Sequence, residues 1–230
     1  MINSSIAIAR STHIPFDQYR EMLRGIRGGP LIWGPQATEI VTGTGVTTST
    51  EDRIYLGTGT TVASTAGRYN SNALQIITGT GTTSGSINWG KKHLFIFTLK
   101  IASTSADCTW RMHFTQATTI GALAAHGLGI KIINLALSLV TYGTGGSETA
   151  VAGSTLTLAR NYHIVIEHDP ATADRLYLNG ALDATQSTAA NIPSTEPDAT
   201  YNVFFSVARS GTDATDRDGR LWNTLAYREE

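Results

Sequence analysis

Charged residues are scarce in this chain of 230 residues. They make up 15% of the sequence, against about 25% in typical soluble domains. The 17 basic and 18 acidic residues leave a net charge of −1. No basic excess points to a nucleic acid partner, and no acidic tail points to a solvating arm. Much of the surface must therefore be Thr, Ser, Gly and Asn, which suits β-rich proteins of assemblies or of the cell exterior.

Cysteine and long apolar runs are also lacking. Cys108 is the sole cysteine, which excludes an intramolecular disulfide and a metal site built from several cysteines. The first thirty residues contain no basic segment followed by an apolar core and a cleavage site, so no signal peptide is predicted. The apolar stretch SSIAIA is too short to span a membrane. We therefore expect a protein made in a cytosol, without a membrane partner.

Residues 13–30, HIPFDQYREMLRGIRGGP, are predicted to form a short helix. Apolar residues recur there at three- and four-residue steps, basic residues share the opposite side, and Gly28-Gly29-Pro30 would end the helix. The helix could cover one end of its own domain or dock on a neighbouring subunit, and both remain open. The residues expected to make assembly contacts are Phe16, Tyr19, Arg20, Leu23, Arg24 and Arg27.

From about residue 36 the chain reads as short β segments separated by Gly, Thr and Ser. Regularly recurring turn signals are typical of a β-sandwich or jelly roll. No helices of crossover length alternate with the strands, which argues against a parallel α/β sheet. The run GLGIKIINLALSLV, residues 127–140, is read as strand, although its apolar pattern could also be helical. We predict an arm of residues 1–35 and one all-β domain over residues 36–230, an antiparallel two-sheet β-sandwich.

The stretch RLYLNGALDATQS, residues 175–187, predicts a tight β-hairpin. Asn179-Gly180 fits the two positions of positive φ in a type I′ turn. Leu176 and Leu178 should face one side of the strand, and Arg175 and Tyr177 the other.

Three segments in order resemble the concanavalin A-like lectin/glucanase superfamily, which includes laminin-G-like domains. TLTLARNYHIVIEHDPATADRLYLNGALDATQSTAANIP resembles the central hairpin, RDGRLWNTLAYREE the closing strand, and INWGKKHLFIFTLKIAST the first long sheet strand. The resemblance is best over residues 160–228, weaker over 86–115 and absent over 1–35. It implies two antiparallel sheets in a jelly roll, one of them with a concave face.

Glucanases of this superfamily use a Glu-x-Asp-x-x-Glu strand, in which two carboxylates act as nucleophile and acid/base. Glu167-His168-Asp169 begins this motif, but Thr172 stands where the second glutamate is needed and Pro170 interrupts the strand. Asp169-Pro170 is better read as the start of a turn. We therefore expect no glycosidase activity and no catalytic residues.

Two groups of residues are candidate metal sites. His163 and Glu167 should share one face of a strand, but they lie too far apart along it to share a metal without a third ligand. Asp213, Asp216 and Asp218 supply three oxygen ligands in the loop GTDATDRDGR, which suits calcium. The alternative is that these residues make Asx-turns in a hairpin loop. No other cofactor is expected.

A glycan site needs aromatic faces and a few polar side chains on one surface. The aromatic candidates are Trp33, Trp89, Trp110, Trp222, Tyr55, Tyr142 and Tyr201. Large aromatic residues in strands most often belong to the core, and Trp110 is read as core because it alternates with Met112 and Phe114. Trp222 faces away from Leu221, so Trp222 and Tyr201 are the proposed glycan-binding residues.

Two functional classes follow. The first is a non-enzymatic virion structural protein, such as a capsid decoration or accessory protein of a phage-like particle, made in the host cytoplasm. Its partners would be further copies of itself, as a homo-oligomer, and a major capsid or other virion protein. The second is a glycan-binding module of a receptor-binding fibre or surface adhesin. A weaker alternative is a shell-forming jelly-roll capsid protein.

Overall fold

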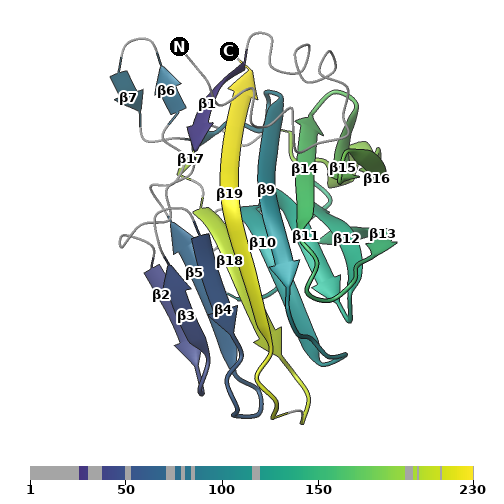
Figure 1. Ribbon diagram of the computed structural model, residues 1–230. Coiled ribbons are helices and arrows are strands. Elements are labelled where there is room, and N and C mark those ends of the chain that lie inside the picture. Colours follow the sequence, from purple (N-terminus) through teal and green to yellow (C-terminus); the bar gives the residue numbers. More distant parts are fainter. Residues whose placement is uncertain are drawn as a thin grey trace.

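The computed structural model describes residues 26–30, 38–49, 53–70, 76–78, 81–83, 86–115, 120–194, 199–200, 202–212 and 214–229. Within these ranges two large antiparallel β-sheets stack face to face (Figure 1). The predicted antiparallel two-sheet sandwich is thus confirmed. No helix in the described part of the chain is long and apolar enough to cross a membrane.

The eight-stranded sheet has the strand order β16-β15-β14-β9-β19-β4-β3, with β1 paired to β19. Along β19, β9 occupies one edge, while β4 pairs with its first half and β1 with its second half. This sheet consists of β1 (Ile26–Pro30), β3 (Val46–Ser49), β4 (Arg53–Gly57), β9 (His93–Ile101), β14 (Tyr162–Asp169), β15 (Ala173–Leu178), β16 (Ala181–Gln186) and β19 (Asp218–Glu229).

The seven-stranded sheet has the strand order β13-β12-β11-β10-β18-β5-β2. It consists of β2 (Thr38–Thr42), β5 (Thr65–Asn70), β10 (Cys108–Thr115), β11 (Gly127–Ile133), β12 (Ala136–Tyr142), β13 (Thr149–Thr155) and β18 (Asn202–Arg209). Smaller elements are β6 (Ile76–Thr78) with β7 (Gly81–Thr83), β8 (Ser86–Ile87) with β17 (Ala199–Thr200), and a short 3₁₀ helix, η1 (Ala189–Asn191).

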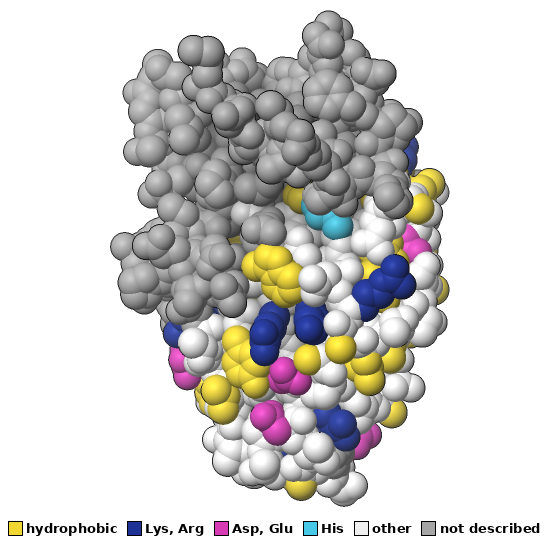
Figure 2. All heavy atoms as spheres, in the orientation of Figure 1, with side chains coloured by type: hydrophobic (Ala, Val, Ile, Leu, Met, Phe, Trp, Pro, Cys, Tyr) yellow, Lys and Arg dark blue, Asp and Glu magenta, His cyan; other side chains and the backbone are white. Residues whose placement is uncertain are grey.

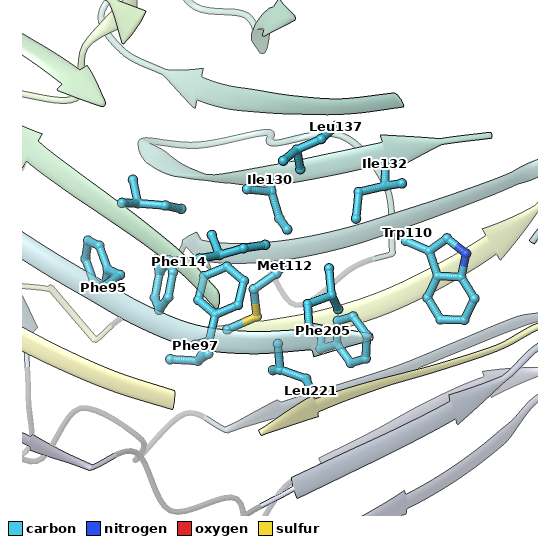
Figure 3. Close-up of a cluster of buried hydrophobic side chains, with 14 of the residues drawn as sticks. Phe95, Phe97, Trp110, Met112, Phe114, Ile130, Ile132, Leu137, Phe205 and Leu221 are labelled. Atoms are coloured by element: carbon cyan, nitrogen blue, oxygen red, sulfur yellow. The ribbon is translucent and has the colours of Figure 1, made fainter. Parts of the chain in front are cut away.

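The core lies between the two sheets, because alternate residues of each strand point inward. Phe95 and Phe97 of β9 meet Phe114 of β10, and the rings of Phe95 and Phe114 stack with centroids 3.9 Å apart (Figure 3). Trp110 is fully buried, as predicted, and stacks on Phe205. The core therefore uses one face of each sheet, and the alternate side chains of each strand point to the opposite face.

The hairpin predicted around Asn179-Gly180 is confirmed. Both residues have positive φ, 51° and 88°, and Leu178 pairs with Ala181 across the turn. Leu176 is fully buried, whereas Tyr177 lies on the opposite face of the sheet.

One prediction of local structure was wrong, and another was right in the type of element but not in its extent. Ile26–Pro30, predicted to end a helix, is strand β1, because it completes the edge of β19 beyond the end of β4. The proline of this segment suits an edge strand, and its glycines and proline are poor helix formers. The run over residues 127–140 is β and not helical, as predicted, but it forms two strands: β11 and β12 make a hairpin that reverses at Asn134-Leu135, with φ of 46° and 68°. Leu135 is an unusual residue at positive φ, so the turn has no sequence signal at its second position.

Candidate functional site

The outer face of the eight-stranded sheet, opposite the core, holds a strip of aromatic and basic side chains. Tyr55 lies on β4, Arg220 and Trp222 on β19, and Thr98 and Lys100 on β9. Each of them alternates with a buried core residue, so all five point to the same outer face. We call Tyr55, Thr98, Lys100, Arg220 and Trp222 the aromatic–basic strip.

The strand register places the members of the strip side by side. Arg220 lies between Tyr55 on one neighbouring strand and Lys100 on the other, and Trp222 lies opposite Thr98. The guanidinium carbon of Arg220 sits 5.8 Å from the centroid of the Tyr55 ring, within cation–π range. Figure 2 shows basic side chains between hydrophobic ones in the middle of this face, with acidic side chains next to them.

The side chains of the strip are accessible to solvent, whereas side chains further along the same outer face are buried. Arg220 is exposed, and Trp222, Tyr55, Thr98 and Lys100 are half-buried. Further along the same face, Leu94, Ile96 and Val165 are buried, with exposed fractions of 2% or less. The strip therefore marks the boundary at which this face changes from buried and apolar to accessible and polar.

Acidic residues flank one end of the strip. Asp218 precedes Arg220 on the same face of β19, and Asp216 lies in the loop before it. Burial raises the pKa of the Tyr55 hydroxyl, and the charges of Asp218 and Asp216 raise it further while Arg220 lowers it. Tyr55 therefore stays protonated at neutral pH and can donate a hydrogen bond.

The predicted calcium ligands are only partly described. Asp213 lies outside the described residues. Asp216 Oδ1 accepts a hydrogen bond of 2.7 Å from the backbone N–H of Gly59, and Asp218 Oδ1 accepts one of 2.8 Å from the Ser103 hydroxyl. Over the described ranges, no three His, Cys, Asp or Glu residues are grouped closely enough to hold a metal ion. The calcium site stays a prediction, because its first ligand is not described.

Glu167 also lies on the outer face, and its carboxylate is engaged. The Tyr177 hydroxyl donates a hydrogen bond of 3.0 Å to Glu167 Oε2, and Arg175 Nη1 lies 3.4 Å from the same oxygen. Burial and the Glu167 carboxylate raise the pKa of Tyr177 to about 12, so this hydroxyl remains a donor. The arrangement holds Glu167 in a polar cross-strand cluster with Tyr177 and Arg175.

His163 and His168 lie on opposite sides of β14, as the alternation of side chains along a strand requires. His163 is half-buried on the outer face, where it lies opposite Thr98 of the strip, and burial lowers its pKa. His168 is fully buried on the inner face and forms a pair with Asp174. The two histidines therefore belong to different environments, and among the described residues neither is grouped with others that could hold a metal ion.

A second charged cluster, on the outer face of the seven-stranded sheet, is internally paired. Glu148 Oε2 accepts hydrogen bonds of 2.7 Å from Arg111 Nη1 and from the backbone N–H of Leu123, and Glu148 Oε1 lies 3.7 Å from Lys131 Nζ. The charges of this cluster thus pair with one another within the protein. The aromatic–basic strip differs, because no ion pair joins Lys100 or Arg220 to any described residue.

Of the two glycan-binding residues predicted from the sequence, Trp222 lies in the strip and Tyr201 is outside the described residues. Trp89 and Trp110 are fully buried core residues, and Trp33 is not described. Sequence reasoning missed Arg220, Lys100 and Thr98, because only the pairing of β19 with β9 brings them together. Of the predicted assembly contacts, Arg27 lies in β1, and the others, Phe16, Tyr19, Arg20, Leu23 and Arg24, are not described.

No protein-family model matches the chain, and no curated protein matches it. Solved structures do match in fold. One is botulinum neurotoxin type C, whose cell entry is dependent upon interaction with two ganglioside molecules, with 11% identity, a TM-score of 0.55, and coverage of 87% of this chain and 47% of that chain. Another is the ligand-binding domain of botulinum neurotoxin serotype D in complex with N-acetylneuraminic acid, with 10% identity, a TM-score of 0.52, and coverage of 99% and 50%.

A third match is the binding domain of Paraclostridial Mosquitocidal Protein 1, with 9% identity, a TM-score of 0.53, and coverage of 90% of this chain and 49% of that chain. These proteins are binding domains of toxins. The chain spans about half the length of each of them. At such low identity the likeness establishes a shared β-sandwich architecture.

Proposed function

We propose that the protein is a concanavalin A-like β-sandwich module that binds a glycan, without catalysing a reaction, through the aromatic–basic strip. The observation that carries the proposal is the placement of Trp222 and Tyr55 on neighbouring strands, both partly accessible and on one face. Aromatic rings offer flat apolar surfaces to the C–H face of a sugar ring, while nearby polar groups fix its orientation.

The polar groups of the strip suit the hydroxyl-rich rim of a sugar. Tyr55 and Thr98 provide hydroxyls that can donate or accept, and Lys100 and Arg220 provide donors only. Both rings and all these donors lie on strands of the sheet, so the backbone that positions them is already in place before a ligand binds. The similarity in fold to toxin binding domains, including one in complex with N-acetylneuraminic acid, supports this assignment over a virion role.

The test is a glycan array probed with the wild-type protein and with Trp222→Ala. We expect specific hits, and we expect Trp222→Ala to weaken each of them by about tenfold or more, because stacking area is lost. Tyr142→Ala is the matched control, since Tyr142 is another half-buried aromatic residue, on the seven-stranded sheet. An array without hits, or equal binding by all three proteins, would overturn the proposal.

The virion role remains a prediction from composition, with a homo-oligomer and a capsid protein as the expected partners and the virion as the expected location. It requires a symmetric oligomer. Light scattering at high protein concentration tests it, and a monodisperse monomer that binds no particle would argue against it.

A further inference from the structure

We infer that the aromatic–basic strip is built for an acidic saccharide, whose carboxylate lies between Arg220 and Lys100 while its ring stacks on Trp222. This inference rests on the proposed glycan-binding function and specifies the class of glycan. It is carried by the placement of two cations next to each other, next to an accessible aromatic ring.

Arg220 and Lys100 are direct partners across the β19–β9 pair. Directly opposed residues of antiparallel strands have their Cβ atoms only about 5 Å apart, and like charges in such positions repel each other. Neither side chain forms an ion pair with a described residue, although other basic side chains of this protein, such as Arg111, do. A bound anion would relieve this repulsion, and it would make charge-assisted hydrogen bonds to both groups.

The contact between Arg220 and Tyr55 leaves the guanidinium able to bind. A cation–π contact uses the charge of the guanidinium over the ring, but its N–H groups lie in the guanidinium plane and remain free to donate. Arg220 is also exposed. The tyrosine ring therefore restricts the movement of Arg220 without occupying its hydrogen-bond donors.

The charges around the strip determine which side an anion can approach. Asp218 begins β19 and Asp216 lies in the loop before it, both close enough to Tyr55 to affect its pKa. They would repel an anion at that end of the strip. Trp222 lies two residues beyond Arg220 in the other direction, about 7 Å along the strand. A carboxylate between the two cations thus has an aromatic ring on the side away from the acidic residues, which is the arrangement that a carboxylated sugar ring requires.

The experiment compares 3′-sialyllactose, lactose and 3′-sulfated lactose by isothermal titration calorimetry. The proteins are the wild type, Arg220→Gln, Lys100→Gln and Arg160→Gln. Arg160 is the matched control, because it is an exposed arginine with its guanidinium carbon 5.9 Å from the Tyr162 ring centroid, away from the strip. Thermal melting of each variant verifies that it is folded.

We expect 3′-sialyllactose to bind more tightly than lactose and to lose about tenfold in affinity in Arg220→Gln and in Lys100→Gln, as the loss of a charge-assisted hydrogen bond predicts. Arg160→Gln should bind as the wild type does. The affinity for 3′-sialyllactose should also fall as NaCl is raised from about 50 to 500 mM, since salt screens the interaction of accessible charges.

Three results would overturn the inference, and they differ in whether the proposed glycan-binding function is also contradicted. Equal binding of lactose and 3′-sialyllactose, abolished in Trp222→Ala, would remove the acidic sugar and keep the glycan site. Equal binding of 3′-sulfated lactose would show that any anion suffices and would remove the carboxylate assignment. Binding of no glycan by the wild type, on the array or here, would remove the proposed function as well.

Discussion

Nδ1 of His168 lies 2.5 Å from Oδ1 of Asp174, and both side chains are fully buried. Nε2 of the same imidazole lies 3.0 Å from the carbonyl oxygen of Trp89, which can only accept, so Nε2 carries a proton. Nδ1 and Oδ1 then share a further proton. Burial raises the pKa of the Asp174 carboxyl, and its second oxygen has no hydrogen-bond partner among the described residues.

We predict that Asp174→Ala destabilises the protein by about 3–5 kcal/mol, because it leaves Nδ1 of His168 buried without a partner. Asp174→Asn should cost much less, on the order of 1 kcal/mol, since its amide N–H can donate to Nδ1 of the neutral imidazole. Urea denaturation of the two variants at pH 7 measures the difference. Equal losses in the two variants would show that the hydrogen bond contributes little.

The pairing of His168 with Asp174 shows how much of this local structure can be predicted from the sequence. The hairpin of β14 and β15 was recognised from its order of residues, and its register places residues 168 and 174 opposite each other. The alternation that puts His163 and Glu167 on one face of the strand also puts His168 on the other face, which in the structure is the buried inner one. That a carboxylate would be buried beside it was not predicted, because Asp169-Pro170 was read as the start of a polar turn. In the structure the strands pair up to Asp169 and Ala173, so Asp174 lies within β15.

The contact of Arg220 with Lys100 could not be predicted from the sequence, because it joins two strands that are far apart along the chain. Arg220 and Lys100 each belong to a strand that the sequence identified, but nothing in either segment specifies that β19 and β9 are neighbours or which residues are opposed. The order of strands in a sheet depends on the packing of the whole core. The candidate site could therefore be predicted in its aromatic member Trp222, and not in the cations beside it.

The second prediction concerns pH and His113 of β10. His113 is buried on the outer face of the seven-stranded sheet, and burial, assisted by the charges of Arg111 and Lys131, lowers its pKa to about 3. Arg111 Nη1 lies 3.4 Å from His113 Nε2, and since arginine can only donate, Nε2 accepts and the imidazole is neutral.

Because the folded state resists protonation of His113, the unfolded state binds more protons below its ordinary pKa of about 6.5. The free energy of unfolding should therefore fall as the pH decreases from about 6.5 toward 3, by on the order of 3 kcal/mol at pH 4 from this residue alone. His113→Gln should remove this part of the pH dependence. Denaturation curves at several pH values would contradict the prediction if wild type and variant lost stability in parallel.

The third prediction concerns Glu148, which links the loop around Leu123 to the seven-stranded sheet. Glu148 is 10% exposed and holds both the Leu123 backbone N–H and Arg111. Glu148→Ala should cost about 2–4 kcal/mol, since it leaves a partly buried arginine unpaired, and should increase amide hydrogen exchange at Leu123. Glu167→Ala is the comparison, because the ion pair of Glu167 with Arg175 is more exposed. With the hydrogen bond from Tyr177 also lost, the substitution should cost about 1–2 kcal/mol. Unchanged exchange at Leu123 would show that the loop is held by other contacts.

The last prediction concerns the turn between β15 and β16. Gly180 has a φ of 88°, a conformation that β-branched residues rarely adopt, so Gly180→Val should destabilise the protein by about 1–3 kcal/mol. Ala181→Val is the matched control, because residue 181 is exposed and begins a strand, where valine is favoured. Thermal melting should show a lower Tm for Gly180→Val and little change for Ala181→Val. A Tm of Gly180→Val equal to that of the wild type would mean that the hairpin can reverse without a glycine at this position.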